Sequence, residues 1–295
     1  MGRLILNADD FGLTAGINRA VIELHRAGVL TSASLMARTA ATDEAIEIAR
    51  TTPTLGVGCH VVLVDGEPVL SPQEIPHLAI PGNGRFRPSL IGFLNWLSRD
   101  SDRRWPFHAR AIREIEAETA AQIALLQSRG LRLTHIDTHK HVHIFPAVLR
   151  PVLRAARAAG IRAVRNPFEP KWSQRATPNA PLLRRAEVSL LRMLEPAFRR
   201  IVAEEGFTTT DGALGVLATG ILDATTITSL LAKLPDGTWE LVTHPGYNDA
   251  ELAQVHTRLR ASREIEREAL LTLQHFPAID LISFAEVHPA SSRHS

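Results

Sequence analysis

The stretch RLILNADDFGLTAGINRAVIELHRAGVLTSASLM, residues 3–36, contains one complete strand–helix–strand unit. Its short apolar runs at 3–8 and 31–36 are typical of buried strands, and the segment at 15–27 has the apolar spacing of a helix. Two strands that are joined by a crossover helix lie parallel in one sheet. This stretch therefore predicts an α/β fold with parallel strands.

The same alternation of strands and helices continues along the chain. Further strands are expected at 55–64, 132–137, 161–165, 214–218, 239–243 and 280–284, and further helices near 42–50, 107–129, 146–159, 181–205, 224–233 and 249–274. Seven or eight such units predict an irregular TIM-like (β/α) barrel of mainly parallel strands, formed by a single domain over residues 1–295. The first turn lacks the glycine spacing of a dinucleotide-binding fold, which argues against that class.

Two insertions interrupt the alternation, at about 65–106 and 166–213. The first is rich in proline and glycine and runs into the aromatic and basic stretch GFLNWLSRDSDRRWPF at 92–107. We interpret it as a functional loop or lid, because a long irregular connection inside a domain usually has a role. The second insertion contains a helical pattern at 181–205 that carries five arginines.

The composition is that of a globular protein of enzyme size. The 295 residues are 45% hydrophobic, and 33 basic residues against 31 acidic ones leave a net charge of only +2, so nucleic-acid binding is not indicated. Cys59 is the single cysteine, which fits a reducing compartment. Acidic residues by position 10 leave no room for a secretory signal, and no run of about 18 apolar residues occurs. We therefore expect a cytoplasmic protein.

Two carboxylates and a histidine lie in or directly after predicted strands, where chemistry is expected. Asp9 and Asp10 directly follow the first apolar run, and α/β folds carry active sites at the carboxyl ends of parallel strands. One carboxylate can bind a metal while the other acts as a base, or the pair can simply cap the next helix. His60 lies in GVGCHVVLV, where a buried imidazole needs either a metal or a backbone partner.

The segment THIDTHKHVHIFP, residues 134–146, gives the strongest signal in the chain. In an extended conformation the alternating His139, His141 and His143 project to one side, together with Asp137. Imidazole is a favoured ligand of zinc and related divalent ions, and three ligands with an open position describe a catalytic site. The alternative is a histidine-rich surface strand.

Two further side chains stand at the ends of predicted strands. His244 precedes a Pro-Gly turn and can act as a general acid toward a leaving amine, or be an ordinary turn residue. Arg165 can orient a carboxylate, hold a substrate oxygen, or lie on the surface. Because the strand ends of a barrel converge, we expect all these side chains to surround one site.

Four motifs occur in order along nearly the whole chain: NADDFG at 7–12, GxGxH at 56–60, THxDTHxHxH at 134–143 and HPGYxD at 244–249. Together they resemble the YdjC-like (ChbG/HpnK) family of carbohydrate deacetylases. Within that family, the stretches that look most like the hopanoid-biosynthesis branch, HpnK, are LTSASLM at 30–36, VDGEPVLSPQEIPHL at 64–78, GRFRPS at 84–89 and the basic insertion before TDGALGVLATG at 210–220.

The resemblance implies a role for each matching position. Asp10, His60 and His139 would bind one divalent metal ion, either Zn²⁺ or Mg²⁺. Asp9 would act as the base and His244 as the acid. The implied reaction is hydrolysis of an acetamide to acetate and a free amine.

The remaining histidines of the motif are implied to lie behind the ligands or to touch the substrate. His141 and His143 match the later histidines of the family pattern, and Arg165 is a further candidate for substrate binding. Lys140 stands where another histidine is common in relatives.

The implied substrate is an N-acetylglucosamine-type sugar, carried on a glycosylated hopanoid lipid. A soluble chito-oligosaccharide, a non-catalytic metal- or lipid-binding barrel, and a sugar isomerase or metal phosphoesterase are the alternatives. For a lipid-linked sugar, the aromatics at 90–107 and the helix at 181–205 can rest on the inner face of an anionic membrane. Otherwise both segments pack against the barrel or against a second subunit in a homodimer.

Overall fold

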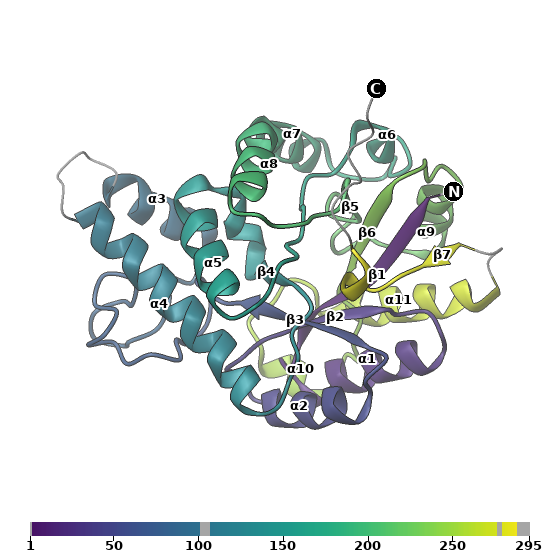
Figure 1. Ribbon diagram of the computed structural model, residues 1–295. Helices are drawn as coiled ribbons and strands as arrows, with labels where there is room; N and C mark the ends of the chain where they lie inside the picture. The colour runs from purple at the N-terminus through teal and green to yellow at the C-terminus, as the bar shows by residue number, and fades with distance from the viewer. Residues whose placement is uncertain (1, 101–106, 276–278, 288–295) are drawn as a thin grey trace.

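The computed structural model describes residues 2–100, 107–275 and 279–287. Its central sheet has the order β4-β3-β2-β1-β6-β5, and every neighbouring pair is parallel. The strands are β1 (Arg3–Phe11), β2 (Ser32–Leu35), β3 (Gly56–Val61), β4 (Ile136–Thr138), β5 (Gly212–Leu214) and β6 (Thr238–Thr243). Figure 1 shows these strands in the middle of the molecule with the helices around them.

The sheet curls until its two edges meet through an irregular segment. Ile136 of β4 bridges Val164, and Ala163 bridges Thr208, both in parallel. The chain then runs from Thr208 directly into β5, so the ring of neighbours is complete. The predicted irregular barrel of mainly parallel strands is thereby confirmed. The predicted strand at 161–165 exists only as these two bridges, because Pro167 has no N–H with which to extend a ladder.

Helices connect the strands on the outside of the ring. They are α1 (Ala15–Arg26), α2 (Thr42–Thr51), α4 (Phe107–Ser128), α5 (Pro146–Ala158), α9 (Ala224–Leu231), α10 (Ala250–Gln254) and α11 (Arg260–Leu271). The first insertion adds α3 (Leu90–Asp100), and the second adds α6 (Lys171–Gln174), α7 (Leu182–Leu191) and α8 (Glu195–Glu204). Helix α1 illustrates the pattern, because Ile17, Val21 and Leu24 recur on one buried face while Thr14 caps its first turn.

Several predicted boundaries differ from the observed ones. The predicted helix at 181–205 is divided by the 3₁₀ turn η2 (Arg192–Leu194), and the one at 249–274 is divided into α10, α11 and η3 (Thr272–His275). Strand β5 begins two residues before the predicted 214–218 and ends at Leu214, directly before Gly215, whose φ of +85° favours glycine. A Cβ there would lie 2.8 Å from the carbonyl oxygen of Val242.

The predicted strand at 280–284 lies outside the ring. It is the two-residue β7 (Asp280–Leu281), which pairs with the beginning of β1 at Arg3 and Leu4 and is followed by η4 (Phe284–Glu286). It therefore covers the amino end of β1, at the opposite end of the strand from Asp9 and Asp10.

Acidic side chains of α4 accept hydrogen bonds from the backbone of the first insertion at residues 69–78. Glu118 accepts hydrogen bonds from the backbone N–H groups of Val69 (2.8 Å) and Leu70 (3.0 Å), and Glu114 accepts from those of His77 and Leu78 (2.9 Å each). These bonds satisfy backbone donors that an irregular loop cannot pair by itself. The part of the insertion between Val69 and Leu78 is therefore bonded to α4.

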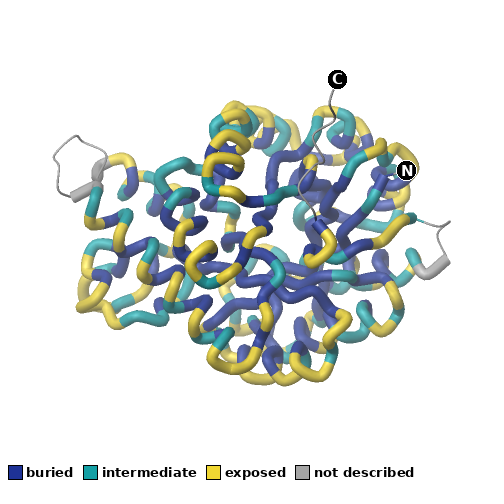
Figure 2. Tube along the Cα trace, in the orientation of Figure 1, coloured by how far each residue is buried: buried dark blue, intermediate teal, exposed yellow. Residues whose placement is uncertain are grey.

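The aromatic side chains of α3 pack inward. Phe93 and Leu97 are buried, and the guanidinium of Arg87 lies 4.6 Å from the ring centre of Trp96. This favours packing over the membrane contact expected for the aromatics at 90–107, of which residues 101–106 lie outside the described residues. Figure 2 shows the buried core running through the strands and the inner sides of the helices. Of the helices that the structure describes, none combines the length and apolarity that crossing a bilayer requires.

Candidate metal centre

Asp9 and Asp10 both face the interior of the ring, although neighbouring residues in a regular strand point to opposite sides. The register between β1 and β2 shifts between Ala8 and Phe11, and Asp10 has a φ of +62°. Aspartate tolerates this left-handed conformation better than most residues. The irregular end of β1 is thus what allows two consecutive carboxylates to contribute to one site.

Asp10 lies beside His60 at the end of β3 and His139 just after β4. The Oδ1 atom of Asp10 is 3.6 Å from His60 Nε2 and 3.3 Å from His139 Nδ1, and the two ring nitrogens are 3.3 Å apart. Ligands placed tetrahedrally at about 2.0–2.2 Å from one ion are separated by roughly 3.4 Å. Within the described part of the chain, the buried Asp10 Oδ1 has no hydrogen-bond partner. These three donor atoms therefore fit a divalent metal ion.

His60 is oriented by a carboxylate behind it. Its Nδ1 donates to Asp137 Oδ1 at 2.9 Å, which leaves the lone pair of Nε2 directed at Asp10 and His139. A carboxylate behind a histidine in this way fixes its tautomer for metal binding. Burial opposes protonation, but the carboxylates of Asp137, Asp9 and Asp10 outweigh it and raise the pKa of His60 to about 9. The carboxylates around His60 therefore favour a positive charge at the site.

The second oxygen of Asp10 is held by Arg263 of α11, a residue that the sequence did not indicate. Arg263 Nη2 lies 2.5 Å from Asp10 Oδ2. Burial raises the pKa of Asp10, but Arg263 and then His139 hold it well below its usual value, so the carboxylate is ionised. Arg263 also passes beneath the Pro-Gly turn, where a Cβ on Gly246 would lie 3.2 Å from Arg263 Cδ. The one feature of the sequence that could have indicated Arg263 is its position on the apolar face of the predicted helix at 249–274.

Arg165 is fully buried beneath the site and contacts three carboxylates. Its Nη1 and Nη2 donate to both oxygens of Asp9 at 2.8 and 2.6 Å, its Nη1 lies 2.5 Å from Asp137 Oδ2, and its Nε donates to Glu240 at 2.8 Å. Burial disfavours its charge, but these carboxylates raise the pKa of Arg165 well above its usual value. Of the roles expected for Arg165, the geometry favours orienting carboxylates, because no part of the side chain is exposed.

A second set of acidic and histidine side chains, Asp9, His60 and Asp137, also brings its ligand atoms within 4.8 Å of one another. The guanidinium of Arg165 already pairs with both of these carboxylates, and all three residues of the set are buried. A cation placed there would have to compete with a buried positive charge. The set that contains Asp10 and His139 is therefore the better candidate for a metal.

His244 directly follows β6 and lies near Asp9. Its Nε2 is 3.9 Å from Asp9 Oδ2, and its Nδ1 is buried with no hydrogen-bond partner among the described residues. Burial, with a smaller effect of Arg263 and Arg165, lowers the pKa of His244 to about 4 against the opposing effect of Asp9 and Asp10. The ring is therefore neutral near pH 7.

The histidine-rich segment is not an extended strand, and the expected alternation past Thr138 is wrong. After β4 the chain forms the 3₁₀ segment η1 (His139–Ile144), in which Lys140 and His141 have φ values of 56° and 54°. The physical reason is that the strand pairs with β3 only as far as Thr138. His139 is thus separated from the later histidines by a tight turn.

The later histidines occupy different surroundings from His139. The ring of His143 is buried between Thr138 Oγ1 (2.7 Å) and the carbonyl oxygen of Arg165 (3.2 Å), so both of its nitrogens are used inside the protein. Of the two roles implied for His143, these contacts favour a place behind the ligands over contact with the substrate. His141 is half-buried, and burial lowers its pKa well below the usual value. Lys140 pairs with Asp65 of the first insertion at 2.6 Å.

Fold and site together define an α/β barrel protein with an Asp–His–His candidate metal centre at the carboxyl ends of its strands. The family model described as YdjC-like protein matches residues 3–277. The chain therefore belongs to the YdjC-like family, as its four motifs indicated.

Several carbohydrate and chitooligosaccharide deacetylases are similar in sequence to this chain. A carbohydrate deacetylase of Thermoanaerobacter pseudethanolicus is 28% identical over 92% of this chain and 91% of its own length. A carbohydrate deacetylase of Brevibacillus brevis is 44% identical over 52% of this chain, and a chitooligosaccharide deacetylase of Salmonella paratyphi B is 38% identical over 54%. These two alignments span 55% and 57% of the relatives' own lengths.

The fold also has a solved counterpart. The crystal structure of a putative cellobiose-phosphate cleavage protein from Enterococcus faecalis V583 superposes with a TM-score of 0.70 and covers 96% of this chain and 97% of that one, at 24% identity. At this identity the similarity concerns the fold alone.

Proposed function

We propose that this protein is a metal-dependent carbohydrate N-deacetylase that hydrolyses the acetamide of an N-acetylglucosamine-type sugar. The observation that carries the proposal is the convergence of Asp10 Oδ1, His60 Nε2 and His139 Nδ1 within 3.3–3.6 Å of one another, beside Asp9 and His244. The relatives named carbohydrate deacetylase support the substrate class.

Asp10, His60 and His139 would hold a Zn²⁺ or Mg²⁺ ion, which supplies polarisation of the acetyl carbonyl and activation of a water molecule. Arg263 fixes Asp10 and Asp137 fixes His60, so that both ligands face the ion without rearrangement. Preorganisation of this kind lowers the cost of reaching the transition state.

Asp9 is the proposed base. The two hydrogen bonds from Arg165 hold its carboxylate in place, where it can accept a proton from the attacking water. Because the ring of His244 is neutral near pH 7, it is able to receive that proton and deliver it to the departing amine. The 3.9 Å between His244 Nε2 and Asp9 Oδ2 suits such a transfer after a small movement. The products are acetate and a free amino sugar.

Two acceptors are proposed for the acetylated sugar. The resemblance of residues 30–36, 64–78 and 84–89 to the hopanoid branch supports a glycosylated hopanoid lipid. The similarity to a chitooligosaccharide deacetylase supports a soluble chito-oligosaccharide. The test is acetate release from an N-acetylglucosaminyl lipid and from N,N′-diacetylchitobiose, each with and without a chelator and with Zn²⁺ or Mg²⁺ restored.

Chelator-sensitive release from either substrate, recovered on adding metal, is the expected result. The alternative is a non-catalytic metal- or lipid-binding barrel, in which the histidines only stabilise structure. Protein that contains metal by elemental analysis but releases no acetate from either substrate would support that alternative and overturn the proposed activity.

A further inference from the structure

Helix α7 carries its apolar side chains on the side that faces solvent. Of its ten residues only Val188 is buried, whereas Leu182, Leu183 and Leu190 are 84%, 73% and 66% exposed, and Met193 in the following turn is 75% exposed. At about 100° per residue these four side chains fall within one arc of the helix surface. A surface helix normally turns such an arc toward the core. This exposed apolar face therefore lacks a partner within the described chain.

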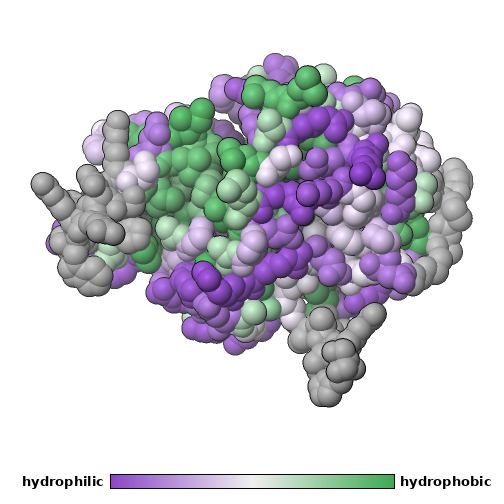
Figure 3. All heavy atoms as spheres, turned by 90° about the horizontal axis from the view of Figure 1, so that it is seen from above, coloured by the Kyte–Doolittle hydropathy of each residue, from purple (hydrophilic) through white to green (hydrophobic). Residues whose placement is uncertain are grey.

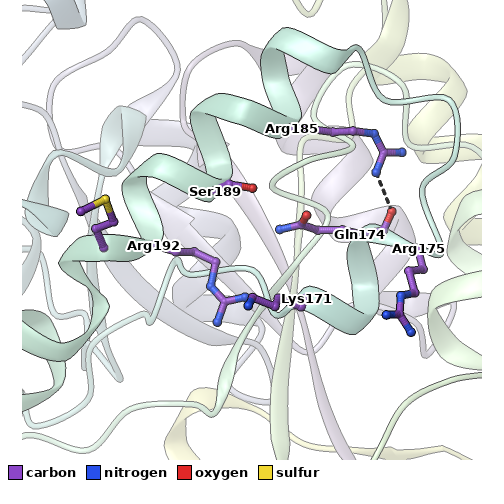
Figure 4. A pocket seen from close by; sticks show the side chains of 7 residues that line it. Lys171, Gln174, Arg175, Arg185, Ser189 and Arg192 are labelled. Carbon is purple, nitrogen blue, oxygen red and sulfur yellow. Dashed lines mark hydrogen bonds between the residues drawn. The ribbon is translucent and has the colours of Figure 1, made fainter.

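A basic pocket adjoins this apolar face. It has a volume of about 510 Å³, and Lys171, Arg175, Arg185 and Arg192 line it together with Met193 of the apolar face. In Figure 4, α7 and the following turn supply Arg185 and Arg192, while α6 and the residue after it supply Lys171 and Arg175. Among the described residues, no carboxylate lines the pocket. The cations that line it suit an anionic group.

The charges of the pocket are only partly compensated nearby. Arg192 Nη2 reaches Glu195 at 3.4 Å, but Arg192 Nη1 is buried without a hydrogen-bond partner among the described residues. Arg185 donates to backbone carbonyls, including that of Gln174 at 3.0 Å, and these leave its positive charge unpaired. Lys171 and Arg175 are exposed. An incoming anion would therefore meet several cations at once.

The surface lies at the rim of the barrel that carries the candidate metal centre. Val188 of α7 packs with Ala180 and Leu217, and Leu217 follows the carboxyl end of β5. Arg184 donates to the carbonyl oxygen of Val216 in the same loop at 3.1 Å. Figure 3 looks onto the side that carries α6, α7 and α8 and shows hydrophobic patches beside hydrophilic ones.

We propose that the apolar face of α7 and the basic pocket dock this protein on an anionic lipid bilayer. Leucine and methionine side chains would enter the interfacial region while the lysine and arginines meet phosphate headgroups. A second copy of this chain is the less favoured occupant, because a symmetric contact places the same surface on both subunits and would bring two basic pockets together. The inference does not depend on the deacetylase activity.

The test measures flotation of the intact protein with vesicles of equal parts phosphatidylglycerol and phosphatidylcholine, and with vesicles of phosphatidylcholine alone. Binding is expected only to the anionic vesicles and should weaken with added salt. The double variant Leu183→Glu/Leu190→Glu is expected to abolish it. The double variant Lys171→Glu/Arg175→Glu should weaken it by about tenfold, since each basic residue near a charged surface contributes substantially.

A matched control has the same change in net charge at a distant position. Arg26→Glu/Arg132→Glu replaces two exposed arginines outside the second insertion and should leave flotation unchanged. Circular dichroism and thermal melting of every variant establish that it folds. Failure of the unaltered protein to float with anionic vesicles, or equal losses in both charge-reversal variants, would overturn the proposal. Light scattering could instead show that the unaltered protein is a dimer. If Leu183→Glu/Leu190→Glu dissociated that dimer but left lipid binding unchanged, the proposal would also be overturned.

Discussion

Arginines occupy two contrasting regions of this molecule. Beneath the candidate metal centre, Arg165 is completely buried and is surrounded by the carboxylates of Asp9, Asp137 and Glu240. In the basic pocket between α6 and α7, four cations line an open space that no described carboxylate lines. In the first region, carboxylates of the fold neutralise the charge of Arg165. In the second region, the charges of the four cations remain available to another molecule.

The difference follows from the cost of removing charge from water. A buried ion loses several kcal/mol of hydration, so it persists only with well-placed partners, whereas an exposed arginine keeps its water and needs none. Buried arginines are therefore expected to matter for stability and for positioning the site, and exposed ones for meeting another molecule.

The largest effect is expected for Arg165→Met. It leaves three buried carboxylates without their cation, which should lower the free energy of unfolding by about 3–5 kcal/mol. Arg175→Met in the basic pocket should change it by less than about 0.5 kcal/mol, because that side chain is exposed. Urea unfolding monitored by circular dichroism measures both. Similar small changes in the two variants would show that burial does not distinguish these arginines.

Asp9→Asn separates the proposed base from the proposed ligands. The amide can still accept from Arg165 but cannot take a proton from water, so turnover should fall by about 10²–10⁴-fold while bound metal is retained. His139→Ala should lose the metal as well as the activity. Metal content after dialysis and acetate release together test the assignment. Undiminished activity in Asp9→Asn would remove Asp9 from the role of base.

Arg263→Lys tests whether a buried arginine positions a metal ligand. Lysine keeps the charge but cannot reproduce the fixed guanidinium that holds Asp10 Oδ2, so metal affinity should fall by about 10–100-fold. Isothermal titration of the metal-free protein measures the affinity. Arg260→Lys, at an exposed position of the same helix, is the control and should bind metal normally. Equal affinities in the two variants would indicate that Arg263 only supports packing.

Glu266 is a buried acid whose charge the surroundings compensate incompletely. Burial raises the pKa of Glu266 to about 8, although the backbone N–H of His244 and the charge of Arg263 lower it. The native protein then keeps a proton that the unfolded chain loses near pH 4.5, so stability falls as pH rises toward 8. The slope is up to about 1.4 kcal/mol per pH unit. Glu266→Gln does not titrate and should flatten this slope in urea unfolding of the metal-free protein. Equal slopes for the unaltered protein and Glu266→Gln would contradict the raised pKa of Glu266.

Local pattern was enough to predict the parallel α/β barrel, because strand-like and helix-like periodicities alternate along nearly the whole chain. It also placed Asp10, His60 and His139 at strand ends, and topology alone brings such ends together. The family followed from four motifs with fixed order. These features depend on local pattern and connectivity, which a sequence records directly.

Other features of the site and surface depend on long-range contacts and are visible only in the folded protein. The fold turned Asp9 and Asp10 inward through a shifted register, ended β4 at Thr138, and brought Arg263 from α11 onto Asp10. It also turned the apolar face of α7 toward solvent, although the same spacing in the sequence is typical of a core-facing helix. Backbone register, and which side of a helix is buried, depend on segments that are far apart along the chain, so local pattern could not determine them.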